Sequence, residues 1–149
     1  MKKILFSTLF LAMLFLNANA QVDGKAIGLR FGGFSGVGAE VSYQHPLGNA
    51  NRLEADLGLS NWGVGLTGVY QWVWDLSALS DGFNWYAGVG GTLGLSDSNF
   101  GLGVVGQVGI EYNFNIPLQL SLDYRPTIYV LPSVAGGYDG ICLSVRYKF

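Results

Sequence analysis

The sequence contains one cysteine, one histidine and four prolines, and only 12% of its residues are charged. A single cysteine excludes an internal disulfide. The one histidine leaves no metal-ligand spacing, so neither a metal nor another cofactor is expected. No block of like charge, proline-rich linker or low-complexity tail interrupts the chain. Together with the length of 149 residues, this predicts a single folded domain.

Long hydrophobic runs are also missing, except at the N-terminus. Two lysines precede an apolar stretch over Ile4–Leu16, and a small-residue cleavage site follows at Ala18–Ala20. This order predicts a secretory signal peptide over residues 1–20 and a mature domain over residues 21–149. An uncleaved anchor is the alternative. It is disfavoured because a spanning helix needs roughly 20 apolar residues, and no later stretch supplies them.

Positive charge is scarce as well. Removal of residues 1–20 would leave six basic against ten acidic residues, a net charge of −4. A mildly acidic chain gives no electrostatic basis for binding a phosphate backbone, so no nucleic-acid partner is expected.

Glycine, with 23 residues, and aromatic side chains, at 14%, are abundant. The mature region has no helical period. Its short runs alternate apolar with polar residues and are separated by turn residues, which predicts an all-β chain of about eight antiparallel strands. The expected strands are Ala26–Phe34, Gly36–Pro46, Arg52–Asn61, Gly63–Asp75, Phe83–Leu95, Phe100–Asn113, Leu118–Val130 (interrupted at Pro126) and Gly140–Phe149.

Each predicted strand has one charged or small-residue face and one apolar face. If the apolar face is the core, the chain is a soluble barrel or sandwich. If that face is outside, the charges fill a narrow lumen as paired networks and the apolar band meets lipid. The charged face carries Arg30, Glu40, Arg52, Glu54, Asp56, Asp75, Glu111, Asp123, Arg125, Arg146 and Lys148.

The aromatic residues favour the second arrangement. If the chain starts on the periplasmic side, most of its large rings fall at the periplasmic ends of the strands and face outward. Trp and Tyr collect at membrane–water interfaces, whereas a soluble core has no reason to gather rings at one end. The predicted girdle comprises Tyr43, Trp72, Trp74, Trp85, Tyr112, Phe114 and Tyr147, with Phe149 beside them.

The final strand carries the most specific pattern, because it alternates strictly and ends in phenylalanine. The chain resembles the small eight-stranded outer-membrane β-barrels of Gram-negative bacteria, the OmpA/OmpX-type group. That resemblance implies a transmembrane up-and-down barrel in the outer membrane, with lipid and the barrel-assembly machinery as partners. The positions that match the assembly signal of the group are Ile141, Leu143, Val145, Tyr147 and Phe149.

Three functions compete. The leading one is a non-enzymatic outer-membrane barrel with a structural, envelope-related or weak ligand-binding role. The second is a soluble lipocalin- or avidin-like barrel with an apolar cavity. The third is a lipid-modifying enzyme, which would need a polar catalytic cluster near the external rim. No such cluster can be assembled, because His45 lies at the periplasmic turn and Cys142 has no base nearby.

Small residues gather on the inward face of the predicted external half. A shallow cleft that opens outward is one interpretation, and it would accept a small ligand or the end of a lipid chain. Inward curling of the strands without a void is the other. The residues concerned are Gly38, Gly58, Ser60, Gly65, Thr67, Gly90, Thr92, Gly94, Gly103, Cys142 and Ser144.

Two G-x-G-x-x-G matches, Gly63–Gly68 and Gly101–Gly106, fall within predicted strands. A dinucleotide site needs a strand before the glycines and a helix after them, so neither match predicts a nucleotide site.

Overall fold

The computed structural model describes residues 22, 24–32, 38–60, 63–97, 100–132, 135–137 and 140–149. The predicted signal peptide lies outside these residues. No helix within them is long and apolar enough to cross a membrane. The strands are β1 (Ala26–Gly32), β2 (Ala39–Pro46), β3 (Asn51–Ser60), β4 (Gly63–Asp75), β5 (Phe83–Leu95), β6 (Phe100–Asn113), β7 (Leu118–Tyr124), β8 (Thr127–Leu131), β9 (Ala135–Gly137) and β10 (Ile141–Lys148).

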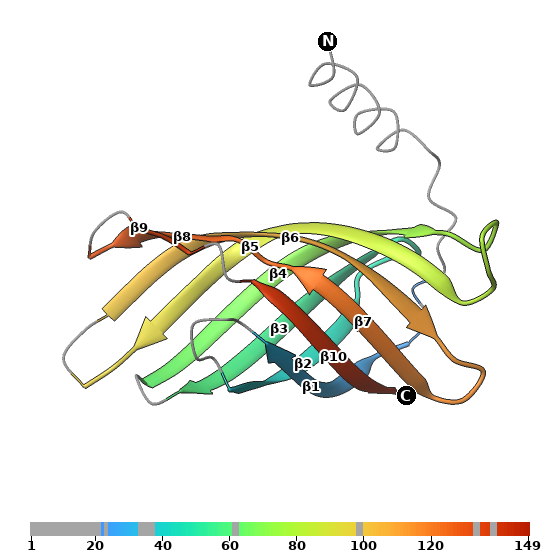
Figure 1. The fold of residues 1–149 in the computed structure, drawn as a ribbon, viewed down its shortest axis with the longest axis horizontal. Helices are drawn as coiled ribbons and strands as arrows, with labels where there is room; N and C mark the ends of the chain where they lie inside the picture. Colours follow the sequence, from blue (N-terminus) through green and yellow to red (C-terminus); the bar gives the residue numbers. More distant parts are fainter. Residues whose placement is uncertain are drawn as a thin grey trace, which may run out of the picture.

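The strands form a closed antiparallel barrel (Figure 1). Each strand from β1 to β6 pairs with the next along the chain, β6 pairs with both β7 and β8, and β7 pairs with β10. The ring closes where β10 pairs with β1 from Ala26↔Lys148 to Gly32↔Cys142. Counting β7 and β8 as one wall position, the prediction of an eight-stranded up-and-down all-β barrel is confirmed.

The seventh wall position differs from its prediction. A single strand was expected over Leu118–Val130, but β7 ends before Pro126 and β8 begins after it. Proline has no N–H to donate to a ladder, so a strand commonly breaks or bulges there. Beyond the break, β8 stays paired with β6 but turns its other edge to β9 rather than to β10. The short strand β9 lies in a segment that was expected to be a loop.

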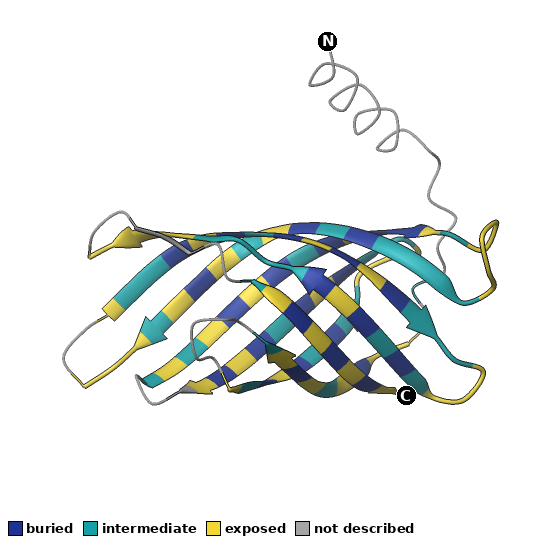
Figure 2. Cartoon of the chain, in the orientation of Figure 1, coloured by how far each residue is buried: buried dark blue, intermediate teal, exposed yellow. Residues whose placement is uncertain are grey.

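Burial alternates along the strands (Figure 2). On β10 the inward residues are buried, with Cys142 at 6%, Ser144 at 0% and Arg146 at 1% exposure, whereas the outward Leu143 is 49% exposed. The same alternation runs through the other long strands. In the described residues the buried positions are mostly polar or charged, and the exposed positions include most of the large apolar side chains.

Glycine at position 90 is required by a close approach between β4 and β5. A Cβ added there would overlap the Gly68 carbonyl oxygen and lie 2.8 Å from Val69 Cα, whereas one added at Gly94 would meet no atom of the described residues within 4 Å. We therefore expect Gly90→Ala to lower the free energy of unfolding by about 1–3 kcal/mol, because the backbones must separate. Gly94→Ala on the same strand is the control. Equal urea midpoints for the two variants would contradict the close approach.

Candidate functional site

The lumen of the barrel contains a network of ion pairs at mid-height. Arg30 on β1 lies between Glu40 on β2 and Asp123 on β7, with distances of 2.9 and 2.5 Å. Arg125, just after β7, reaches across the lumen to Glu40 at 2.7 Å and to Asp56 on β3 at 2.6 Å. The five side chains are at most 11% exposed. We call them the mid-lumen cluster.

A second group of ion pairs lies nearer the end of the barrel where β1 begins and β10 ends. Arg146 Nη2 on β10 lies 2.9 Å from Glu54 Oε2 on β3, and both side chains are fully buried. Arg52 Nη2 lies 2.6 Å from Glu111 Oε2, an ion pair without the geometry of a hydrogen bond. These four residues form the lower cluster, which contains two positive and two negative side chains.

The structure thus brings together nine of the eleven charged residues that the sequence placed on one face. Asp75 is exposed at the end of β4, where its carboxylate accepts hydrogen bonds from the backbone N–H and the hydroxyl of Ser77. Lys148 is half-buried at the end of β10, and its backbone N–H donates to Pro117. Neither belongs to the two clusters, because both lie at the rim of the barrel.

Uncharged side chains connect the charged ones, and sequence reasoning did not assign them this role. Gln107 donates to Glu54 at 3.1 Å and accepts from Gln71 at 2.8 Å. Gln44 also donates to Glu54, at 2.7 Å. Their inward position could have been predicted from the sequence, because each glutamine lies on the same strand face as the charged residues. Gln71 in turn accepts from Arg52 Nε at 2.6 Å, so the amides of Gln71 and Gln107 link a cation to the anion Glu54, and these residues belong to the site.

Tyr86 on β5 is the largest aromatic ring inside the lumen and is fully buried. Its hydroxyl donates to Asp123 at 3.1 Å, and the Arg52 guanidinium lies 4.9 Å from its ring centroid. We expect Tyr86→Phe to lower the free energy of unfolding by about 1.5–3 kcal/mol, because a hydrogen bond to a buried charge is lost. Tyr147→Phe, at an exposed position, should leave the urea midpoint unchanged. An equal effect of both substitutions would count against the network.

The aromatic residues predicted to form a girdle lie at one end of the barrel, on the right in Figure 1. Trp74 and Trp85 stack with their ring centroids 4.2 Å apart, which leaves Trp74 only 8% exposed. Tyr112 packs edge-on against Phe114 at 4.6 Å. Tyr147 and Phe149 stack at 6.5 Å. Tyr43 lies at the same end, with its hydroxyl 3.4 Å from the His45 ring.

The final strand forms the seam of the barrel, because β10 pairs with β1 on one side and β7 on the other. The side chains predicted to carry the assembly signal all point outward and are 38–61% exposed. They are Ile141, Leu143, Val145, Tyr147 and Phe149.

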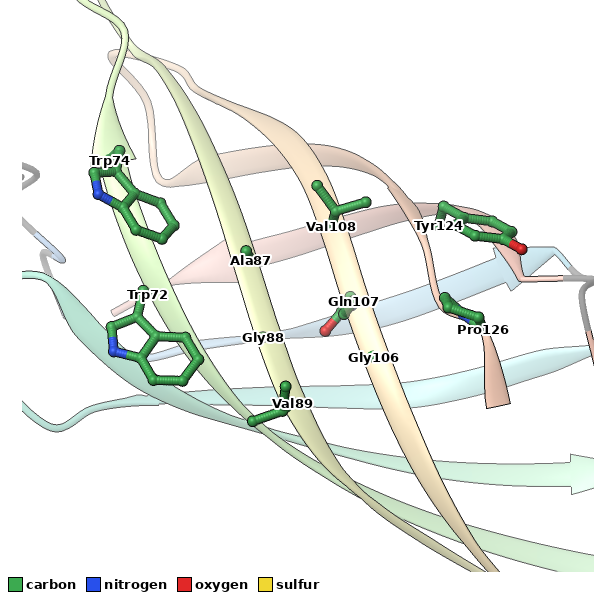
Figure 3. Close-up of a pocket in the computed structure, with 10 residues that line it drawn as sticks. All are labelled: Trp72, Trp74, Ala87, Gly88, Val89, Gly106, Gln107, Val108, Tyr124 and Pro126. Carbon is green, nitrogen blue, oxygen red and sulfur yellow. The ribbon is translucent and has the colours of Figure 1, made fainter. Parts of the chain in front are cut away.

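An apolar groove of about 620 Å³ lies on the outer wall (Figure 3). The rings of Trp72 and Trp74 on β4 stand at one side of it, and Tyr124 and Pro126 stand at the other. Small side chains make the floor between them, with Ala87, Gly88 and Val89 from β5 and Gly106 and Val108 from β6. The groove exists because large rings flank strands that carry small outward residues.

The inner face of the opposite end is only partly filled. The hydroxyls of Thr67 and Thr92 are 2.8 Å apart and buried. A Cβ added to Gly58 would meet the Glu40 side chain at 3.3 Å, and one added to Gly103 would meet Thr92 and Tyr129. Additions at Gly38 and Gly94 would meet no atom of the described residues within 4 Å. Beside the mid-lumen cluster the inner face is therefore closely packed, whereas the described residues leave the positions of Gly38 and Gly94 without close neighbours.

The remaining sequence motifs lie apart from one another. His45 is near the end of β2, whereas the buried Cys142 is near the start of β10. The glycine matches fall inside β4 and β6, with no helix after them. In the part of the chain that the structure describes, no three His, Cys, Asp or Glu side chains gather to hold a metal ion.

Comparison with known proteins identifies no relative. No family model matches this chain, and neither a curated protein nor a solved structure matches it significantly.

Proposed function

We propose that this chain is a non-enzymatic β-barrel protein of the Gram-negative outer membrane, exported by a signal peptide over residues 1–20. Its role would be structural, envelope-related or weak ligand binding. The observation that carries the proposal is the inverted distribution of side chains. Among the described residues, the ion pairs are buried in the lumen, while large apolar side chains of every strand from β1 to β6 are exposed on the outer wall.

That distribution is unfavourable for a barrel in water. A soluble monomer rarely exposes a contiguous apolar patch larger than a few hundred Å², whereas the outer wall here is apolar on successive strands. In a bilayer the same apolar side chains would contact lipid tails instead of water, which costs little free energy. Strands β3 to β6 have 10–14 residues, which meets the roughly 9–11 residues that a tilted membrane strand needs.

The lumen supports a structural or binding role rather than conduction. Eight strands leave an interior just wide enough for side chains. Arg125 and Arg146 each reach from one wall to carboxylates on strands of another wall, Arg125 to Glu40 and Asp56, and Arg146 to Glu54. Ion pairs that cross the lumen at two levels support an interior occupied by side chains rather than an open pore.

Partners follow from the same surfaces. Outer-membrane lipid would contact the apolar wall and the aromatic end. The barrel-assembly machinery would read the outward residues of β10 during insertion. A small-molecule ligand is not identified by the site, and the rim near Gly38 and Gly94 is where the proposed shallow cleft would lie.

Expression in a Gram-negative host tests the proposal. We expect the protein in the outer-membrane fraction, extracted only by detergent and migrating faster on a gel before boiling than after it. Recovery as a folded, soluble periplasmic monomer would contradict the proposal and favour a soluble barrel, whose dye binding in detergent-free buffer could then be measured. A change in lipid A mass that depends on the protein would instead favour a lipid-modifying enzyme.

A further inference from the structure

The buried charges of the lumen do not balance. In the lower cluster, Arg52 and Arg146 match Glu54 and Glu111. In the mid-lumen cluster, two arginines face three carboxylates, those of Glu40, Asp56 and Asp123. No other basic side chain of the described residues compensates at this height, because one remaining lysine is exposed and the other lies at the rim.

The segments outside the described residues do not supply the missing charge either. Their only basic residues are the two lysines of the predicted signal peptide. Each of the three carboxylates contacts an arginine, but the cluster carries one excess negative charge, and excess buried charge of one sign favours the neutral form of a carboxyl. The mid-lumen cluster therefore requires one more positive charge, and a proton is the smallest that fits among side chains already in contact.

The hydrogen bonds identify which carboxylate is least stabilised as an anion. Glu40 accepts one bond from Arg30 and two from Arg125. Asp123 accepts from Arg30 and from the hydroxyl of Tyr86. Asp56 accepts one bond from a cation, Arg125 to Oδ2 at 2.6 Å, and a further one from the uncharged hydroxyl of Ser42. Its other oxygen, Oδ1, is buried and has no hydrogen-bond partner among the described residues.

The neighbours of Asp56 strengthen this assignment. Glu54 stands two residues away on the same face of β3, and its own positive partner is Arg146. On β2, Asp56 is opposite Ser42, with Glu40 the nearest acidic residue on that face. On β4 it is opposite the uncharged Thr67. Among the described residues, the one cation that hydrogen-bonds to Asp56 is Arg125, which also binds both oxygens of Glu40.

We propose that the mid-lumen cluster is a proton-binding site and that Asp56 carries the proton in the folded barrel at neutral pH. The proton brings the buried lumen charge to zero. A neutral carboxyl with one unpartnered oxygen costs far less to bury than a charged one. The number of buried charges in the lumen is the same whether the outer wall meets lipid or water. The proton-binding site therefore does not rest on the proposed function. Release of the proton at alkaline pH leaves three carboxylates sharing two guanidinium groups.

Infrared spectroscopy of the purified, folded protein tests the proposal. A protonated carboxyl has a C=O stretching band that carboxylates lack, and the band shifts in deuterated water. We expect this band in the unsubstituted protein at neutral pH, its loss in Asp56→Asn, and its retention in Asp75→Asn, a matched aspartate exposed at the rim. Absence of the band before substitution, or its persistence in Asp56→Asn, would overturn the proposal.

Stability gives a second readout that an ordinary ion pair would not produce. Asparagine mimics the neutral acid, so Asp56→Asn should fold and keep its urea midpoint from neutral to alkaline pH. In the unsubstituted protein and in Asp75→Asn, the urea midpoint should fall over that range. The folded state keeps a proton on Asp56 that the unfolded chain releases, so rising pH favours unfolding. Failure of Asp56→Asn to fold, or a parallel pH dependence in all three proteins, would also overturn the proposal.

Discussion

Replacement of Arg146 by methionine is expected to lower the free energy of unfolding by about 3–5 kcal/mol. The guanidinium is fully buried and donates to Ser42 at 3.0 Å, to Ser121 at 2.8 Å and to Glu54 at 2.9 Å. Methionine fills a similar volume but leaves Glu54 as an uncompensated charge in the lumen. The cost therefore comes mainly from the carboxylate left behind and should appear as a lower urea midpoint in detergent micelles.

A matched control lies two residues further along the same face of β10. Lys148→Met removes a charge at the half-buried rim and should change the free energy of unfolding by less than about 1 kcal/mol. The double variant Arg146→Met with Glu54→Gln should recover part of the loss, because no charge is then left unpaired. Equal effects of Arg146→Met and Lys148→Met would show that the lower cluster does not stabilise the barrel.

A charge on the outer wall gives the second large effect. Val108 lies on the outward face of β6, 42% exposed, at the floor of the groove. If this face meets hydrocarbon, Val108→Arg should cost about 2–4 kcal/mol in a bilayer. On a soluble surface the same substitution should stay within about 0.5 kcal/mol. Urea titration of the protein folded into lipid vesicles distinguishes the two results.

The control is Leu79→Arg, in the turn between β4 and β5, where the side chain is 81% exposed. An arginine there reaches water in either environment, so Leu79→Arg should leave the free energy of unfolding nearly unchanged. A neutral effect at both positions would contradict the assignment of the outer wall to lipid. A large effect at both would point to a general intolerance of added charge instead.

Much of the barrel could be predicted from the sequence because two-residue alternation is a local property. The bounds of β4, β5 and β6 agree with their predictions, since each is a long alternating run between clear turns. The break after β7 was signalled by Pro126. Strand β9 was not predicted, because Ala135–Gly137 is too short and too rich in glycine to show alternation.

The candidate site was only partly predictable. Alternation placed Arg30 and Asp123 on the inward face, but they are 93 residues apart and meet only because β1 and β7 flank β10 in the closed ring. The sequence alone does not set how far a side chain reaches across the lumen. Asp75 was misplaced for a similar reason. It lies on the inward face of β4, but it is the last residue of that strand, so its side chain extends past the rim and bonds Ser77.

A spin label on the outward face of β10 reports whether the apolar wall meets lipid or water. A nitroxide would be attached at Leu143→Cys in a chain carrying Cys142→Ser, reconstituted into lipid vesicles. We expect oxygen, which concentrates in hydrocarbon, to relax the label more strongly than a water-soluble nickel chelate does. Stronger relaxation by the nickel chelate, or a folded chain that stays in solution without entering the vesicles, would contradict lipid contact at the apolar wall.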